Sequence, residues 1–165
     1  MTDPAARQPR PISIVIAEPK WRDAVPDIVA KLRRAARLAL KHRRKGQAQA
    51  LTILLGDDAT LQRLNCDYRG KDKPTNVLSF PAAANEHGYL GDIAMAYGVA
   101  AREARAAGKS LCDHASHLAV HGVLHLLGYD HETAADAELM EPLEVAILAG
   151  LGIADPYAAR PAHVA

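Results

Sequence analysis

Residues 121–131 read HGVLHLLGYDH, a stretch that places three histidines in an otherwise aliphatic run. On a helix, His121 and His125 are four residues apart and project from the same face. Gly128 is typical of a helix C-terminus, where a left-handed glycine turns the chain back and can bring His131 over the exposed last turn. We therefore expect a central helix that ends in a metal site formed by these three imidazoles.

His117 lies on the same helical stripe, so His117, His121 and His125 are an alternative set of ligands. At about 1.5 Å rise per residue, His117 and His125 would stand ~12 Å apart. Bonds from zinc to imidazole nitrogen are only about 2.0–2.1 Å long, so one ion cannot bind all three on a straight helix. The set with His131 is preferred, and it leaves the fourth zinc position open to water, as in a catalytic site.

The spacing HxxxHxxGxxH is that of metzincin peptidases, except that Gly122 stands where their glutamate follows the first histidine. That glutamate is the usual general base of a zinc peptidase. Its replacement makes peptide hydrolysis less expected without excluding it, because zinc-bound water with a pKa near 7 is itself a usable nucleophile.

The rest of the chain predicts an α+β fold: a mixed four-stranded sheet packed with about five helices, with the zincin-like metal site on a central helix. The predicted strands are residues 12–16, 51–55, 76–80 and 90–96. The predicted helices span residues 21 to about 45, 58 to just before Gly70, 99–107, 110–127 and 134–149, with Asp58 and Ser110 as N-caps. Pro142, inside the last helix, predicts a kink or a delayed start.

Length and composition predict one domain, residues 12–157, between loose tails at 1–11 and 158–165. Residues 1–83 hold 16 Lys and Arg against 8 Asp and Glu, whereas residues 84–165 hold 4 against 11. This asymmetry suggests a face that meets a polyanion. Cys66 and Cys112 form no metal or disulfide pattern, and no apolar segment suggests a membrane span, so we expect a soluble cytoplasmic protein with free thiols.

A second candidate element is the basic loop YRGKDKPTNVLSF, which begins at Tyr68 and contains Arg69, Lys71 and Lys73. A guanidinium can grip two phosphate oxygens and stabilise charge that develops during phosphodiester cleavage, so Arg69 is the strongest candidate. The basic helix of residues 31–45, which contains Arg43 and Arg44, could extend this loop into a polyanion track that leads to the metal.

Four segments together resemble the YbeY family of bacterial rRNA-maturation endoribonucleases, over about residues 12–157. They are HxxxHGVLHLLGYDH, YRGKDKPTNVLSFP, LGDI and ELMEPLEVAILAGLGIADPY. The resemblance implies a single-strand-specific metallo-endoribonuclease that acts in maturation of the 16S rRNA 3′ end and in late ribosome quality control. Its partners would be single-stranded rRNA and the ribosome or small-subunit ribosomal proteins.

The family's zinc-binding histidines map onto His121, His125 and His131, with one zinc ion per chain, and its essential arginine maps onto Arg69. These four residues are the expected catalytic set. The chain departs from the family pattern at Asn76, where the loop usually has aspartate, and at Pro142, where the last helix usually runs unbroken. Asp92 and Asp130 are candidates to orient a ligand imidazole from behind.

Two other functions fit the same residues. The zinc could be structural, in a factor whose basic face docks on rRNA or the ribosome without cutting RNA. Alternatively, the protein could be a peptidase-like metal hydrolase that uses a different base in place of glutamate.

Overall fold

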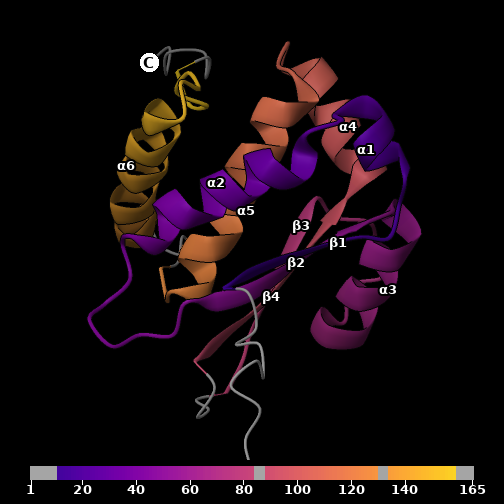
Figure 1. The fold of residues 1–165 in the computed structure, drawn as a ribbon. Helices are drawn as coiled ribbons and strands as arrows, with labels where there is room; N and C mark the ends of the chain where they lie inside the picture. Colours follow the sequence, from indigo (N-terminus) through magenta and orange to yellow (C-terminus); the bar gives the residue numbers. More distant parts are fainter. Residues whose placement is uncertain (1–10, 84–87, 130–133, 159–165) are drawn as a thin grey trace, which may run out of the picture.

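The computed structural model describes residues 11–83, 88–129 and 134–158. Six helices and four strands occur in these ranges (Figure 1). The expected N-terminal tail falls almost entirely outside them, as do all but the first residue of the expected C-terminal tail. No helix in the described part of the chain is long and apolar enough to cross a membrane.

The four strands form one mixed sheet, as the sequence predicted. They are β1 (Ile12–Ile16), β2 (Ala50–Gly56), β3 (Val77–Pro81) and β4 (Tyr89–Ala96), arranged in the order β1-β2-β4-β3. The first three strands of this order are parallel, and β3 pairs antiparallel with β4 at the edge. Pro81 is the last residue of β3, an edge position where a missing backbone donor is tolerated.

The single helix predicted for residues 21 to about 45 is wrong. Two helices occupy this segment, α1 (Lys20–Ala24) and α2 (Ile28–Leu40), and Pro26 lies between them. Proline has no backbone N–H and disfavours a helical conformation in the preceding residue, so the helix cannot run through it. The extra break raises the number of helices from the expected five to six.

The remaining helices are α3 (Asp58–Arg69), α4 (Tyr97–Ala106), α5 (Leu111–Leu126) and α6 (Ala134–Gly150). The cap of α3 is Asp57 rather than Asp58, and its carboxylate accepts a hydrogen bond of 2.8 Å from the Thr60 amide. Ser110 caps α5 as predicted, by accepting from the Asp113 amide at 3.0 Å. Helix α6 begins at Ala134 and contains Pro142, so its start is not delayed.

Strand alternation sends apolar side chains to both faces of the sheet. Leu51, Ile53 and Leu55 of β2 pack into the larger core, with α2 and α5. Leu54 joins a smaller core on the other face, where Leu61 of α3 is fully buried. Helix α5 therefore lies between the sheet and the outer helices, and α3 covers the opposite face (Figure 1).

Helix α5 approaches the sheet closely at Gly122. A Cβ atom at this position would lie 3.0 Å from Cδ1 and Cγ2 of Ile93 in β4, closer than ordinary contact distance. The Ser79 hydroxyl of β3 also donates a 3.2 Å hydrogen bond to the Gly122 carbonyl. Position 122 thus faces the sheet, which explains on steric grounds why the glutamate of a zinc peptidase is missing here.

We predict that Gly122→Leu lowers the free energy of unfolding by about 3 kcal/mol, because the added side chain overpacks the contact with Ile93. Gly150→Leu is the matched control, since a Cβ there would meet only Leu38 at 3.8 Å. Chemical denaturation of both variants checks this. Equal stability of Gly122→Leu and the control would contradict the packing described here.

Candidate functional site

Helix α5 presents His117, His121 and His125 along one stripe, at intervals of one helical turn. The rings of His121 and His125 lie 4.7 Å apart between centroids, nearly edge to face. The rings of His117 and His121 are more widely separated, at 6.5 Å. The close pair is therefore the one that the sequence predicted as neighbouring metal ligands.

A buried carboxylate from α6 joins two of these histidines. Glu144 is only 1% exposed and binds His121 Nδ1 through Oε1 at 2.6 Å. Its Oε2 binds His117 Nε2 at 2.9 Å and also accepts a hydrogen bond from the Tyr157 hydroxyl. All three partners converge on one carboxylate at the junction of α5, α6 and the C-terminal segment.

The protonation of this cluster follows from its contacts. Burial acts to raise the pKa of Glu144, but hydrogen bonds from His117 and His121, the charge of His121 and the Tyr157 hydroxyl together lower that pKa to about 2. An ionised carboxylate only accepts hydrogen bonds, so His121 must carry a proton on Nδ1. A metal ion would then bind His121 through Nε2, the arrangement in which a carboxylate commonly orients a ligand histidine.

His117 has a different role from the one its place on the stripe suggests. Its Nε2 is engaged by Glu144, and its ring packs edge to face against Tyr157, with centroids 5.7 Å apart. His117 therefore helps to hold the carboxylate that orients His121.

Two predicted residues of the site, His131 and Asp130, lie outside the described residues. Within ranges 11–83, 88–129 and 134–158, no group of three His, Cys, Asp or Glu side chains is placed to hold a metal ion. The described part nevertheless fits a zinc site: two imidazoles on adjacent turns, one of them oriented by a buried carboxylate.

Arg69 is the last residue of α3 and is exposed, as are Lys71 and Lys73 in the following loop. Gly70, at φ 68°, ends the helix in the left-handed conformation. The buried Asn65 amide then donates a 3.0 Å hydrogen bond to the Lys73 carbonyl and folds the loop back onto α3. A buried helix residue that the sequence did not mark thus anchors the basic loop.

The residues next to Arg69 and His125 in sequence contact the same end of the β3–β4 pair from opposite faces of the sheet. On the α3 face, Tyr68 stacks on Phe80 with ring centroids 5.1 Å apart. On the α5 face, Leu126 lies against Gly91, where a Cβ atom would come within 2.8 Å of its side chain. Phe80 and Gly91 are at this same end, since Gly91 pairs with Pro81.

Asp92 lies on the α3 face of the sheet, where it accepts a hydrogen bond from the Tyr89 hydroxyl, which also contacts Thr52. The carboxylate that contacts a predicted ligand is instead that of Glu144. Arg43 and Arg44 follow α2, where the Arg44 amide donates to the Gln47 side chain at 3.0 Å. Helix α2 packs on the α5 face of the sheet and α3 on the other face, so Arg43 and Arg44 lie apart from Lys71 and Lys73, which follow α3.

Local contacts explain the asparagine at position 76, where the YbeY pattern usually has aspartate. The Asn76 amide donates a 3.0 Å hydrogen bond to Glu103 of α4, whose carboxylate also binds His114 at 3.0 Å. An aspartate at position 76 could not donate to Glu103 and would repel it. Asparagine therefore links the start of β3 to α4, outside the ligand set.

Glu144 and Tyr157 were missed as site residues because their partners are distant in sequence. For Glu144 a signal existed: an acidic residue in an otherwise apolar helical segment, LEVAIL, needs a buried partner. Nothing in the local sequence around Tyr157 marks it.

Comparisons with known proteins identify relatives of this chain. A family model described as Endoribonuclease YbeY matches residues 16–152. The Endoribonuclease YbeY of Paramagnetospirillum magneticum is 49% identical over 156 residues, which cover 88% of this chain and 94% of the relative. That of Alkalilimnicola ehrlichii is 52% identical over 142 residues, covering 83% and 85%.

A solution structure of a Thermotoga maritima protein is similar in fold, with a TM-score of 0.51 and 22% identity. The match covers 92% of this chain and 98% of the other. At this level of identity, the likeness supports the fold alone.

We predict that Glu144→Gln lowers zinc affinity by about 10- to 100-fold, because a neutral amide cannot accept from both histidines as the carboxylate does. Competition with a zinc chelator measures the change. Glu138→Gln, on an exposed position of the same helix, is the control and should bind zinc like the unmodified chain. Equal affinities for the two variants would show that Glu144 does not orient a ligand.

Proposed function

The chain belongs to the YbeY endoribonuclease family, and we propose that it is a zinc-dependent endoribonuclease that cuts single-stranded RNA. The observation that supports this most strongly is the pairing of His121 with buried Glu144 beside His125. A histidine that a carboxylate orients in this way is prepared to act as a metal ligand.

In this proposal, His121, His125 and His131 hold one zinc ion per chain. When bound, the ion would supply a positive charge that polarises a phosphoryl oxygen and a site for water. The protein's own residues do the rest. Glu144 keeps the proton of His121 on Nδ1, His117 and Tyr157 keep Glu144 in place, and Arg69 stabilises the negative charge that develops on the phosphate.

The sequence neighbours of Arg69 and His125 support a path for the RNA. Tyr68 and Leu126, the sequence neighbours of Arg69 and His125, contact the same end of the edge pair β3–β4. In this proposal an RNA strand passes over this end and reaches both site residues. Lys71 and Lys73, exposed in the loop that follows, would bind phosphates next to the cleaved one. Such a path suits a flexible single strand better than a rigid duplex.

The resemblance to rRNA-maturation endoribonucleases extends the proposal to the cell. The substrate would be the 3′ end of 16S rRNA, during maturation and late ribosome quality control in the cytoplasm. The partners would be the ribosome or small-subunit ribosomal proteins.

The test is cleavage of a fluorescent single-stranded RNA by the purified, zinc-loaded chain. We expect cleavage to stop on chelation and to fall at least about 100-fold in His125→Ala, because removal of one ligand disables the metal site. His42→Ala, which removes a histidine elsewhere, should cut normally. Arg69→Ala should lose about 10²- to 10³-fold in kcat, as expected for a group that stabilises transition-state charge.

Two results would contradict the proposal. Intact RNA in the presence of bound zinc would favour the docking factor with a structural metal. Cleavage of casein without cleavage of RNA would favour the peptidase.

A further inference from the structure

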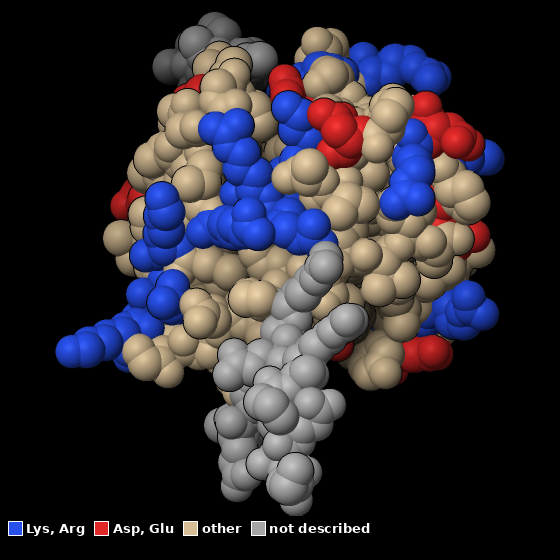
Figure 2. Space-filling view, viewed as in Figure 1, with Lys and Arg blue, Asp and Glu red and all other residues tan. Residues whose placement is uncertain are grey.

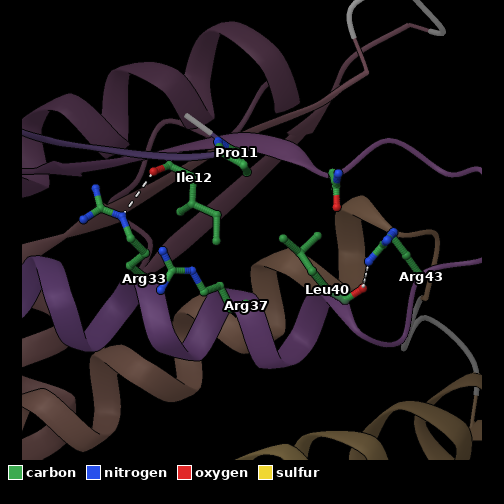
Figure 3. A pocket seen from close by; sticks show the side chains of 7 residues that line it. Pro11, Ile12, Arg33, Arg37, Leu40 and Arg43 are labelled. Carbon is green, nitrogen blue, oxygen red and sulfur yellow. Dashed lines mark hydrogen bonds between the residues drawn. The ribbon is translucent and has the colours of Figure 1, made fainter. Parts of the chain in front are cut away.

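A basic pocket of about 480 Å³ lies between the start of β1 and helix α2 (Figure 3). Arg33, Arg37 and Arg43 line it, together with the apolar side chains of Ile12 and Leu40. We call this hollow the arginine pocket. Its position on α2 separates it from the basic loop after α3.

Two of the three guanidinium groups are anchored by backbone carbonyls. Arg33 Nε donates to the Ile12 carbonyl at 3.3 Å, and Arg43 Nη1 donates to the Leu40 carbonyl at the same distance (Figure 3). A guanidinium has five N–H donors, so one such bond fixes its position and leaves most of its donors for a ligand. Arg37 stands between them on the exposed side of α2.

The pocket has an uncompensated positive charge. None of the residues that line it is acidic, and none of its three arginines forms an ion pair with a carboxylate of the described residues. Figure 2 shows Lys and Arg side chains in a band across the face where α2 lies in Figure 1. Three cations without counter-charges favour an anionic ligand, and guanidinium groups bind phosphate oxygens in pairs.

The pocket also has an apolar wall, and its volume is that of a small-molecule site rather than of a single phosphate. Ile12 and Leu40 are almost fully buried behind this wall, so the exposed Pro11 is the apolar surface that remains for a base or a ribose, and the arginines would bind its phosphate. This combination fits a nucleotide.

The segment that follows α2 contacts the helix end where the histidines lie. The Tyr129 hydroxyl donates to the His42 carbonyl at 3.3 Å, and the Gln47 amide donates to the Leu127 carbonyl at 3.1 Å. His42, the residue before Arg43, therefore contacts Tyr129, which lies just beyond the C-terminus of α5. A strand held at the histidines could continue to the pocket.

We propose that the arginine pocket binds a nucleotide of the RNA strand at a distance from the cleaved linkage. The identity of the ligand as RNA depends on the proposed function. The pocket would act as an anchoring subsite, and its loss would weaken substrate binding without changing the chemistry at the metal.

Arg37→Ala is the most direct test, because no hydrogen bond within the described protein depends on this side chain. Arg34→Ala is the matched control: it removes the same charge from an exposed position of the same helix, outside the pocket. Binding of a fluorescent 12-nucleotide single-stranded RNA is measured by anisotropy over a range of salt concentrations, in the His125→Ala background so that the RNA stays intact.

We expect Arg37→Ala to weaken binding about tenfold and to reduce the magnitude of the salt slope by about 0.7, the value for one lost contact to a single-stranded phosphate. Arg37→Ala with Arg43→Ala should weaken binding further, and Arg34→Ala by less than about twofold. In the unmodified background, the same Arg37→Ala change should raise KM rather than lower kcat.

Equal loss of RNA affinity in Arg37→Ala and Arg34→Ala would contradict the proposed binding site, because it would show that RNA is attracted by the overall positive charge of the helix. Unchanged RNA affinity in Arg37→Ala would overturn it as well. Failure of the proposed function would give another result. The unmodified, zinc-loaded chain would not cut RNA, whereas Arg37→Ala would still bind RNA more weakly than Arg34→Ala.

Discussion

The close approach of α5 to the sheet at Gly122 is the constraint on which the site depends. With no side chain at this position, the helix backbone packs directly against Ile93, and Ser79 bonds the Gly122 carbonyl. This contact fixes the rotation of the helix about its axis. With the Gly122 side of α5 against the strands, His117 and His121 face Glu144 of α6 and Tyr157 of the C-terminal segment.

The second constraint is the buried charge of Glu144. An ionised carboxylate in an apolar core is costly unless its oxygens are hydrogen-bonded, and here His117, His121 and Tyr157 provide that bonding. Two of the donors, His117 and His121, lie on successive turns of α5, and the third, Tyr157, lies in the C-terminal segment. The Glu144 carboxylate therefore links α6 to both. The hydrogen bonds that stabilise the carboxylate also determine which nitrogen of His121 is available to bind a metal.

The sequence was informative wherever the deciding interaction is local. The i, i+4 spacing of His121 and His125, the Ser110 cap and the strand patterns all depend on neighbours within a few residues, and the structure confirms the sheet and the central helix. The sequence did not predict the helix break at Pro26, because apolar residues continue at helical spacing on both sides of it. The choice of Asp57 over Asp58 as a cap could not be made from sequence, since adjacent aspartates are equally suited.

Interactions between distant segments could not be derived in this way. Glu144 lies 23 residues from His121, and only the packing of α6 against α5 brings them together. Likewise, the side of the sheet that Asp92 occupies depends on strand register, which places it beside Tyr89 and Thr52. Asn65, which anchors the basic loop, was not predicted because the helix that contains it was recognised only by its apolar residues.

The most direct measurement of the central claim is zinc K-edge X-ray absorption of the purified full-length chain, with metal analysis of the same sample. We expect one zinc per chain with three imidazole nitrogens at about 2.0–2.1 Å and one oxygen ligand. Thiolate ligands at about 2.3 Å, or a chain that binds no zinc, would contradict it.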